Sequence, residues 1–224
     1  MSSAKAPIFA PYPAGGDDSR RIKMNNSKQY DKTRRMTGLA IFTAIIVVLT
    51  VLCNFVRFGP FSITLALAPI IIGTALYGKR AGAYLGGVFG AVVIITGLLG
   101  WDGGTVMYLM SINPVGVIVI CLGKGIAAGF FAGLVYEAIC KKSEKKAVLV
   151  SGIVCPIVNT GLFIAGMFVF FGNVITGWAQ ANGQTMILYL IMGLTGINFL
   201  VELAVNIVLS SGITTIIKAG KNMK

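Results

Sequence analysis

The sequence predicts an all-α integral membrane protein, a bundle of six transmembrane helices with both termini in the cytoplasm. Three observations predict this fold. Hydrophobic residues make up 56% of the 224 residues and charged residues only 12%, about half the charged share of a soluble domain. The apolar residues gather into six runs separated by polar breaks, as in helical membrane proteins. Lys and Arg fall almost entirely in alternate breaks.

The six apolar runs give the expected helices. In chain order they cover residues 37–56, 63–77, 81–100, 114–139, 147–171 and 186–217. About 20 apolar residues cross a bilayer, so the longest runs must tilt or project from it. The second run is shorter and contains Pro69, and we expect it to be kinked or to lean on its neighbours.

Charge placement predicts the orientation. Of the 19 Lys and Arg residues, 17 precede the first run, follow the last one, or lie in the breaks at 79–80 and 141–146. The positive-inside rule places those segments, and both termini, in the cytoplasm. Arg57 falls in the opposite set of loops, and Lys124 falls inside the fourth run. The net charge of +12 therefore indicates topology rather than nucleic-acid binding.

The chain divides into a leader, a membrane domain and a tail. We expect residues 1–35 to form a cytoplasmic leader, residues 36–218 the six-helix substrate-binding domain, and residues 219–224 a basic cytoplasmic tail. Residues 1–23 are rich in Pro, Gly and Ser and lack the hydrophobic core of a secretory signal. Because "MNNSKQYDKTRR" from Met24 resembles a bacterial start, residues 1–23 are expected to be an added extension or a disordered tail.

Small residues recur every four positions and predict close helix packing. The third and fourth runs carry the glycine stripes Gly82, Gly86, Gly90 and Gly125, Gly129, Gly133. Such stripes let helix backbones approach each other in lipid. Ala40 and Ala44 form a similar pair on the first run. This pair could pack inside the chain or receive a helix of another protein.

Polar side chains at membrane depth mark the candidate site. Lys124 lies ten residues past Pro114, about 15 Å along a helix, and Asn159 lies at a similar depth in the fifth run. In the sixth run Asn198 and Glu202 share one helical face, which Asn206 continues. We expect these residues to converge. Either Lys124 and Glu202 neutralise each other as a buried ion pair, or they form the floor of a polar cavity open to the outside.

The outer loops favour the cavity. "GWDGGTVMYLMSINP" and "GNVITGWAQANGQ" are long, Gly-rich and aromatic, whereas the cytoplasmic turns are short and basic. Such loops suit a lid over a small molecule. They add Trp101, Tyr108 and Asn113 to the candidate binding residues, and Arg57 joins them from the loop after the first run.

The sequence lacks the residues that several classes of protein require. No GxxxxGK[ST] motif is present, so the chain has no P-loop of its own. It contains no histidine, and its four cysteines form no CxxC pair, so we expect neither a metal site nor a cofactor. An enzyme would have only Asp102 and Glu202 for catalysis, and we expect no catalytic activity.

Residues 36–217 resemble the substrate-binding S components of energy-coupling factor (ECF) vitamin transporters. The likeness is carried by six spans, by "AIFTA" on the first run and by the block "SITLALAPIIIGTALYGKRAGAYLGGVFGAVV". It implies a multi-pass protein of the bacterial plasma membrane that captures a vitamin from outside. The protein would then dock, through Ala40 and Ala44, on a coupling membrane subunit driven by two ATPases.

The substrate within that family is less sharply indicated. "KGIAAGFFAGLVYEAI" and "CPIVNTGLF" are most similar to pantothenate-type members. Lys124 would face the vitamin's carboxylate, and Asn159 and Asn198 its polar arm. Folate or riboflavin would instead need flat aromatic surfaces, which Trp101, Tyr108 and Trp178 offer. Outside the family, an autonomous ion-coupled transporter with a Lys124–Glu202 relay is the alternative.

Overall fold

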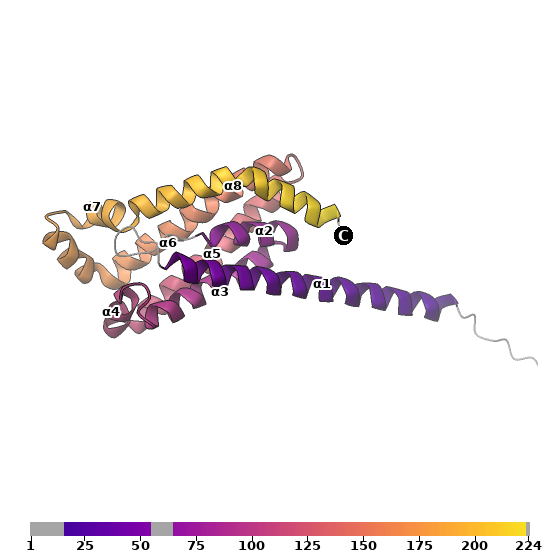
Figure 1. The fold of residues 1–224 in the computed structure, drawn as a ribbon, viewed down its shortest axis with the longest axis horizontal. Helices are drawn as coiled ribbons and strands as arrows, with labels where there is room; N and C mark the ends of the chain where they lie inside the picture. The colour runs from indigo at the N-terminus through magenta and orange to yellow at the C-terminus, as the bar shows by residue number, and fades with distance from the viewer. Residues whose placement is uncertain (1–15, 55–64, 223–224) are drawn as a thin grey trace, which may run out of the picture. The chain divides into compact units, whose positions relative to one another are not determined.

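The computed structural model describes residues 16–54 and 65–222, and all secondary structure in these residues is helical (Figure 1). The chain forms two compact units, residues 1–37 and 38–224. Helix α1 (Gly16–Cys53) crosses the boundary between them. It begins inside the expected leader because residues 17–37 contain neither Gly nor Pro. Arg57 lies outside the described residues.

The remaining elements follow in short succession. They are α2 (Leu67–Tyr77), α3 (Lys79–Leu98), α4 (Thr105–Ile112), α5 (Pro114–Ile139), α6 (Glu144–Ala181), α7 (Met186–Leu188), the π-helical stretch η1 (Tyr189–Gly196) and α8 (Ile197–Asn222). Within the described residues, five helical segments are long and apolar enough to cross a membrane: Lys32–Cys53, Lys79–Leu98, Pro114–Ile139, Glu144–Ala181 and Met186–Leu209. The second predicted span, 63–77, corresponds to α2, which is shorter.

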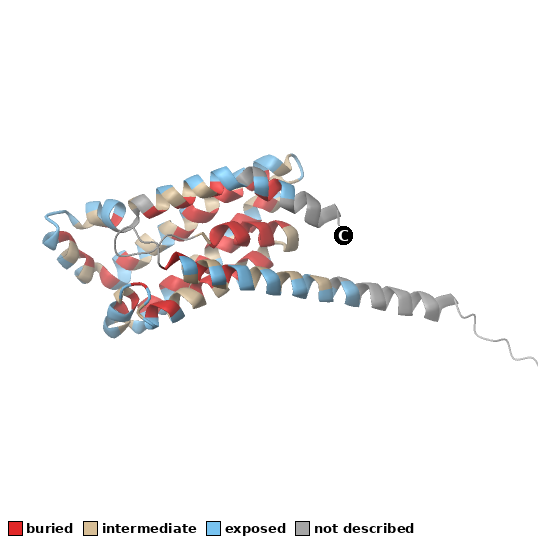
Figure 2. Ribbon diagram, in the orientation of Figure 1, coloured by how far each residue is buried: buried red, intermediate tan, exposed pale blue. Residues whose placement is uncertain are grey.

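Helix α2 is a core element. It has 11 residues, of which nine, from Leu67 to Ala75, are buried (Figure 2). Pro69 lies in its first turn, where the N–H that proline lacks would have no helical partner. Gly78, with φ of +88°, is the single residue between α2 and α3, and this backbone conformation favours glycine.

Helices α3 and α5 pack backbone against backbone, as the two glycine stripes predicted. A Cβ atom built on Gly86 would collide with the carbonyl of Gly125, and one on Gly82 with the carbonyl of Gly129. Gly90 lies against the carbonyl of Cys121 in the same way. At one end of this pair, the Glu137 carboxylate accepts from the Lys79 backbone N–H at 3.0 Å and pairs with its ammonium at 3.1 Å.

The two predicted lid loops are partly helical. Helix α6 continues past its kink at Phe171 (φ −132°, ψ 22°) to Ala181, so most of "GNVITGWAQANGQ" is helix. The other predicted loop contains α4, whose first turn is capped by Asp102. This carboxylate accepts from the N–H groups of Gly104 at 3.0 Å and Val106 at 2.7 Å. The Asp102 cap thus helps to order a segment whose glycine content suggested a loop.

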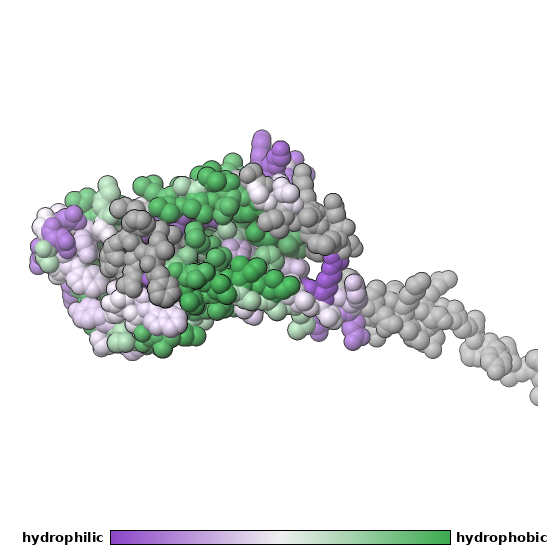
Figure 3. Space-filling view, in the orientation of Figure 1, coloured by the Kyte–Doolittle hydropathy of each residue, from purple (hydrophilic) through white to green (hydrophobic). Residues whose placement is uncertain are grey.

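Residues 38–224 contain two apolar cores. The larger one surrounds α2 and includes residues of α1, α3, α5, α6 and α8. The second joins α4, α5, α6 and η1 through side chains such as Leu109, Ile120, Phe171 and Leu190. Many large apolar side chains remain exposed, and they cover the middle of the face seen in Figure 3. Such a surface suits contact with lipid.

Candidate functional site

Helix–helix contacts fix which candidate residues lie at the same level. Between α5 and α6, the Ser151 hydroxyl donates to the Ala132 carbonyl at 3.0 Å, and Gly166 lies against Ile120. This antiparallel register places Lys124 beside Phe163. Between α6 and α8, Gly152 lies against Asn206. Counting one turn at a time from that contact places Glu202 opposite residue 156 and Asn198 opposite Asn159.

Lys124 is half-buried, and two aromatic rings surround its ammonium. The nitrogen lies 4.9 Å from the centroid of the Phe163 ring and 5.8 Å from that of Phe89. Both distances are in the range of cation–π interactions. Within the described part of the chain, Lys124 forms no ion pair.

The sequence predicted that Lys124 and Glu202 converge at a similar depth. The register of the helices places them at different levels. Glu202 lies opposite residue 156 and Lys124 beside residue 163, a difference of two helical turns, or about 10 Å. The two groups do not form the ion pair that was one alternative.

The amides of Asn159 and Asn198 lie between these two levels. Asn159 and Asn198 are 5% and 7% exposed, and Glu202 is 4% exposed. The Asn159 side-chain oxygen has no hydrogen-bond partner among the described residues. Asn206, one turn beyond Glu202, donates from its amide nitrogen to the Glu202 backbone carbonyl at 2.9 Å. A buried acceptor such as that of Asn159 is costly unless a partner binds it.

The candidates near α4 have different surroundings. The Asn113 side-chain oxygen accepts from the Gly116 N–H at 2.9 Å and caps α5, so this oxygen already has a structural role. Tyr108 and Trp178 stack at 6.1 Å with their planes inclined by 33°. Trp101 and Tyr108 are both exposed. The rings that contact the Lys124 ammonium are those of Phe89 and Phe163, and not those of Trp101, Tyr108 or Trp178.

Sequence reasoning missed the two phenylalanines. Phe163 follows Asn159 by four residues and so shares its helical face, a spacing that could have indicated it. Phe89 follows Gly86 by three residues, and its ring lies next to Gly125. Asn54, at the end of α1, is also buried and was missed, since it lies at the edge of an apolar run.

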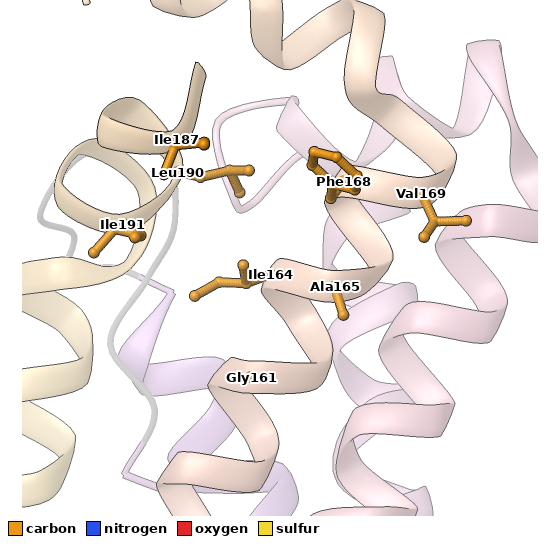
Figure 4. A pocket seen from close by; sticks show the side chains of 8 residues that line it. All are labelled: Gly161, Ile164, Ala165, Phe168, Val169, Ile187, Leu190 and Ile191. Carbon is orange, nitrogen blue, oxygen red and sulfur yellow. The ribbon is translucent and has the colours of Figure 1, made fainter. Parts of the chain in front are cut away.

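Three apolar grooves flank α6. One, of about 290 Å³, runs between α5 and α6 and is lined by Lys124 together with apolar residues such as Val119, Leu162 and Val169. Another, of about 460 Å³, lies between α6, η1 and α8. The third, of about 310 Å³, separates α6 from α7 and η1. Figure 4 shows Ile164 and Phe168 on one side of it, and Ile187, Leu190 and Ile191 on the other. Apart from Lys124 and Thr160, the residues that line these grooves are apolar.

Ala40 and Ala44 lie on the exposed side of α1. Ile46 and Thr50 of the same helix are buried, with exposures of 0% and 6%. Helix α1 therefore presents one face to the core of its own unit and leaves the small-residue face open. Among the residues that the structure describes, no cluster of three or more His, Cys, Asp or Glu side chains could hold a metal ion.

The family model for the substrate-specific component of ECF transporters matches residues 34–214. The chain is also 26% identical over 194 residues to the "Pantothenic acid transporter PanT" of Lactococcus lactis subsp. cremoris (strain MG1363). That alignment covers 82% of this chain and 93% of the relative. The family match ends within α8 and includes every described candidate residue.

Proposed function

Because the chain belongs to the family of substrate-specific components of ECF transporters, we propose that it captures pantothenate from outside the cell. It is a multi-pass protein of the bacterial plasma membrane. The bound vitamin would be delivered through a complex with a coupling membrane subunit and two ATPase subunits. The similarity to a pantothenic acid transporter supports this choice of substrate.

The observation that carries the proposal is the set of groups that surround the Lys124 ammonium. An ammonium lies at membrane depth over two aromatic rings and has no carboxylate beside it among the described residues. A ligand with one carboxylate would supply the missing charge, and a charge-assisted hydrogen bond would form. Pantothenate carries one carboxylate.

The neighbouring amides match the rest of the vitamin. Pantothenate has hydroxyl and amide groups beyond its carboxylate, and Asn159 and Asn198 offer buried amides one turn from Lys124. The Asn159 oxygen would accept from a hydroxyl or amide of the ligand. Folate would need a flat aromatic slot. The rings of Tyr108 and Trp178 lie with their centroids 6.1 Å apart and their planes inclined by 33°, so they do not form the two parallel walls of such a slot.

Ligand identification tests this proposal. We expect mass spectrometry of the detergent-purified protein to recover pantothenate at about one molecule per chain, and titration calorimetry to show that pantothenate binds more tightly than folate or riboflavin. Recovery of folate or riboflavin would keep the family and overturn the substrate. Uptake into liposomes by the purified chain alone, driven by an ion gradient, would support the autonomous transporter instead.

The proposed topology has both termini in the cytoplasm and the α4–α7 end outside. In this topology, segment 63–77, which includes the short helix α2, is added to the five long apolar helices to make six membrane segments. In this orientation Ala40 and Ala44 lie toward the cytoplasmic end of α1. We propose that they receive a helix of the coupling subunit, since small side chains let helix backbones approach closely in lipid.

Replacing both alanines with tryptophan tests the docking face. Because Ala40 and Ala44 are exposed, the variant should bind vitamin normally while losing association with the coupling subunit and ATP-driven uptake. Ile41→Trp, at another exposed position of the same helix, is the matched control for bulk alone. Loss of vitamin binding by the double variant would assign the pair to internal packing.

A further inference from the structure

We propose that Phe89 and Phe163 form an aromatic seat for Lys124 that holds its ammonium in place and leaves it available to an anionic ligand. This inference rests on the proposed function and deepens it, because it assigns selectivity for a carboxylate to two residues that carry no charge. Neither phenylalanine is required to touch the vitamin. They act through Lys124 and are positioning residues.

The seat is built from three helices. Lys124 comes from α5, Phe163 from α6 and Phe89 from α3. The two ring centroids lie 4.9 Å and 5.8 Å from the ammonium nitrogen. Phe89 is 1% exposed, and a Cβ atom on Gly125 would lie 3.4 Å from its ring. The Phe89 ring therefore lies directly against α5 at Gly125, one residue along the helix from Lys124.

An aromatic seat leaves the ammonium different from one held in an ion pair. A carboxylate would neutralise the charge and accept its hydrogen bonds. A ring face attracts the cation through its quadrupole without taking up a conventional acceptor position. The three N–H donors of Lys124 thus stay available. The nearest carboxylate on the proposed polar face, Glu202, lies two turns away along the helices, as the register shows.

The seat also keeps the Lys124 side chain from extending its ammonium toward the membrane surface. A long lysine side chain in a membrane tends to extend its charged end toward the nearest polar region. Lys124 has apolar residues along its stem in the α5–α6 groove, so the groove by itself does not retain the charge. The two ring faces give the ammonium a defined site. A ligand carboxylate then meets a donor that is already placed.

Phe163 is the residue to change, because it is half-buried and closer to the ammonium, whereas Phe89 belongs to the core. Phe163→Leu keeps an apolar side chain and removes the ring. Phe163→Tyr keeps a ring face. Phe168→Leu, on the same helix with 55% of its surface exposed, removes a ring that has no contact with Lys124 and serves as the control.

The ligand pair is as informative as the variants. Pantothenyl alcohol carries a neutral hydroxymethyl group in place of the carboxylate of pantothenate. Calorimetric titration of the full-length protein with both compounds isolates the contribution of the charge. The seat predicts that Phe163→Leu weakens pantothenate binding by about 3- to 30-fold and leaves binding of the alcohol as it is in the wild type. Phe163→Tyr and Phe168→Leu should both retain the wild-type preference for the acid.

The outcomes separate the two proposals. If the wild-type protein does not bind pantothenate, the proposed function fails before the seat is tested. If the wild type binds it and Phe163→Leu weakens the acid and the alcohol equally, the phenylalanine is only a packing residue and the seat is wrong. Should Phe163→Leu fail to fold, the Tyr variant decides, since a lost preference for the acid with the ring face retained would overturn the seat.

Discussion

Two sides of the helical bundle are packed in opposite ways. Between α3 and α5 the backbones touch, because glycines of each helix lie against the backbone of the other at successive turns. Between α6 and the segment from α7 to α8, apolar grooves remain open. In the most apolar stretch of α3 and of α5, 44% of residues are buried, against 22% for α6 and 20% for the segment Met186–Leu209.

We call the closely packed pair α3 and α5 the scaffold, and the more loosely packed side formed by α6 and α8 the wall. The glycine contacts hold α3 and α5 at a fixed distance, so Phe89 and Lys124 have a firm support. The wall made by α6 and α8 carries Asn159, Asn198 and Glu202 with fewer buried neighbours. Regions with few buried contacts open and rearrange at lower cost than cores. We therefore expect the amide side of the site to adjust around a ligand and the lysine side to stay in place.

The largest effect is expected where the backbones touch. Gly125→Leu should destabilise the protein by about 3 kcal/mol or more, because its Cβ would collide with the backbone of Gly86, which cannot move aside without separating the helices. Gly123→Leu, two residues away on the same helix, meets open space and should change stability by less than about 0.5 kcal/mol. Thermal unfolding in detergent compares the two, and similar losses would remove the distinction between scaffold and wall.

The second-largest effect is expected at Lys124, the charged residue of the scaffold helix α5. Lys124→Met should weaken pantothenate binding by about 1.5–3 kcal/mol, roughly 10- to 150-fold, while the protein folds normally. Because Lys124 and Glu202 are not paired, adding Glu202→Gln should not restore stability or binding. Calorimetry and thermal unfolding on the single and double variants measure both quantities. Rescue by the second change would show that the two residues are coupled after all.

A smaller effect is expected at the end of the bundle that holds α4. Asp102→Ala removes the acceptor of two backbone N–H groups and should cost about 0.5–2 kcal/mol of stability. Asp102→Asn keeps an acceptor oxygen and should lose less. Unfolding measurements on both variants test the cap, and equal losses would indicate that the carboxylate charge matters rather than the hydrogen bonds.

The smallest change should be favourable. Gly161 lies inside α6 with open space where a side chain would be, so Gly161→Ala should stabilise the helix by about 0.5–1 kcal/mol. Gly86→Ala, on the scaffold, should destabilise instead because its Cβ meets the Gly125 carbonyl. We expect the unfolding temperature to rise with Gly161→Ala and to fall with Gly86→Ala, relative to the wild type. A rise with both variants would contradict the packing described for α3 and α5.

Periodicity in the sequence predicted much of this architecture. The glycine stripes at 82–90 and 125–133 require only the four-residue repeat of a helix, so their facing arrangement was accessible. The third and fourth runs ended within two residues of α3 and α5. The extension of α6 past Phe171 was not accessible, because glycine-rich sequence usually indicates a loop and the second core around Ile175 depends on tertiary contacts.

The sequence proposes residues for the candidate site, but it does not determine which of them lie at the same level. Membrane depth could be estimated from residue counts, which identified Lys124, Asn159, Asn198 and Glu202. The levels of Lys124 and Glu202 depend on how α6 is aligned with α5 and α8. That alignment is set by contacts such as Ser151 with Ala132, which residue counting along single helices does not include. The ring contacts of Lys124 were missed for the same reason.

Helix α2 has a consequence for the order in which the chain assembles during its synthesis. Its 11 residues extend about 16 Å, roughly half of a hydrocarbon core, so its ends cannot rest in lipid with their backbone groups exposed. Its surroundings come from α3, α5, α6 and α8, and Ile213 of α8 is part of the core around it. Helix α2 leaves the ribosome before α3, α5, α6 and α8, and its burial is therefore complete only after α8 has been made.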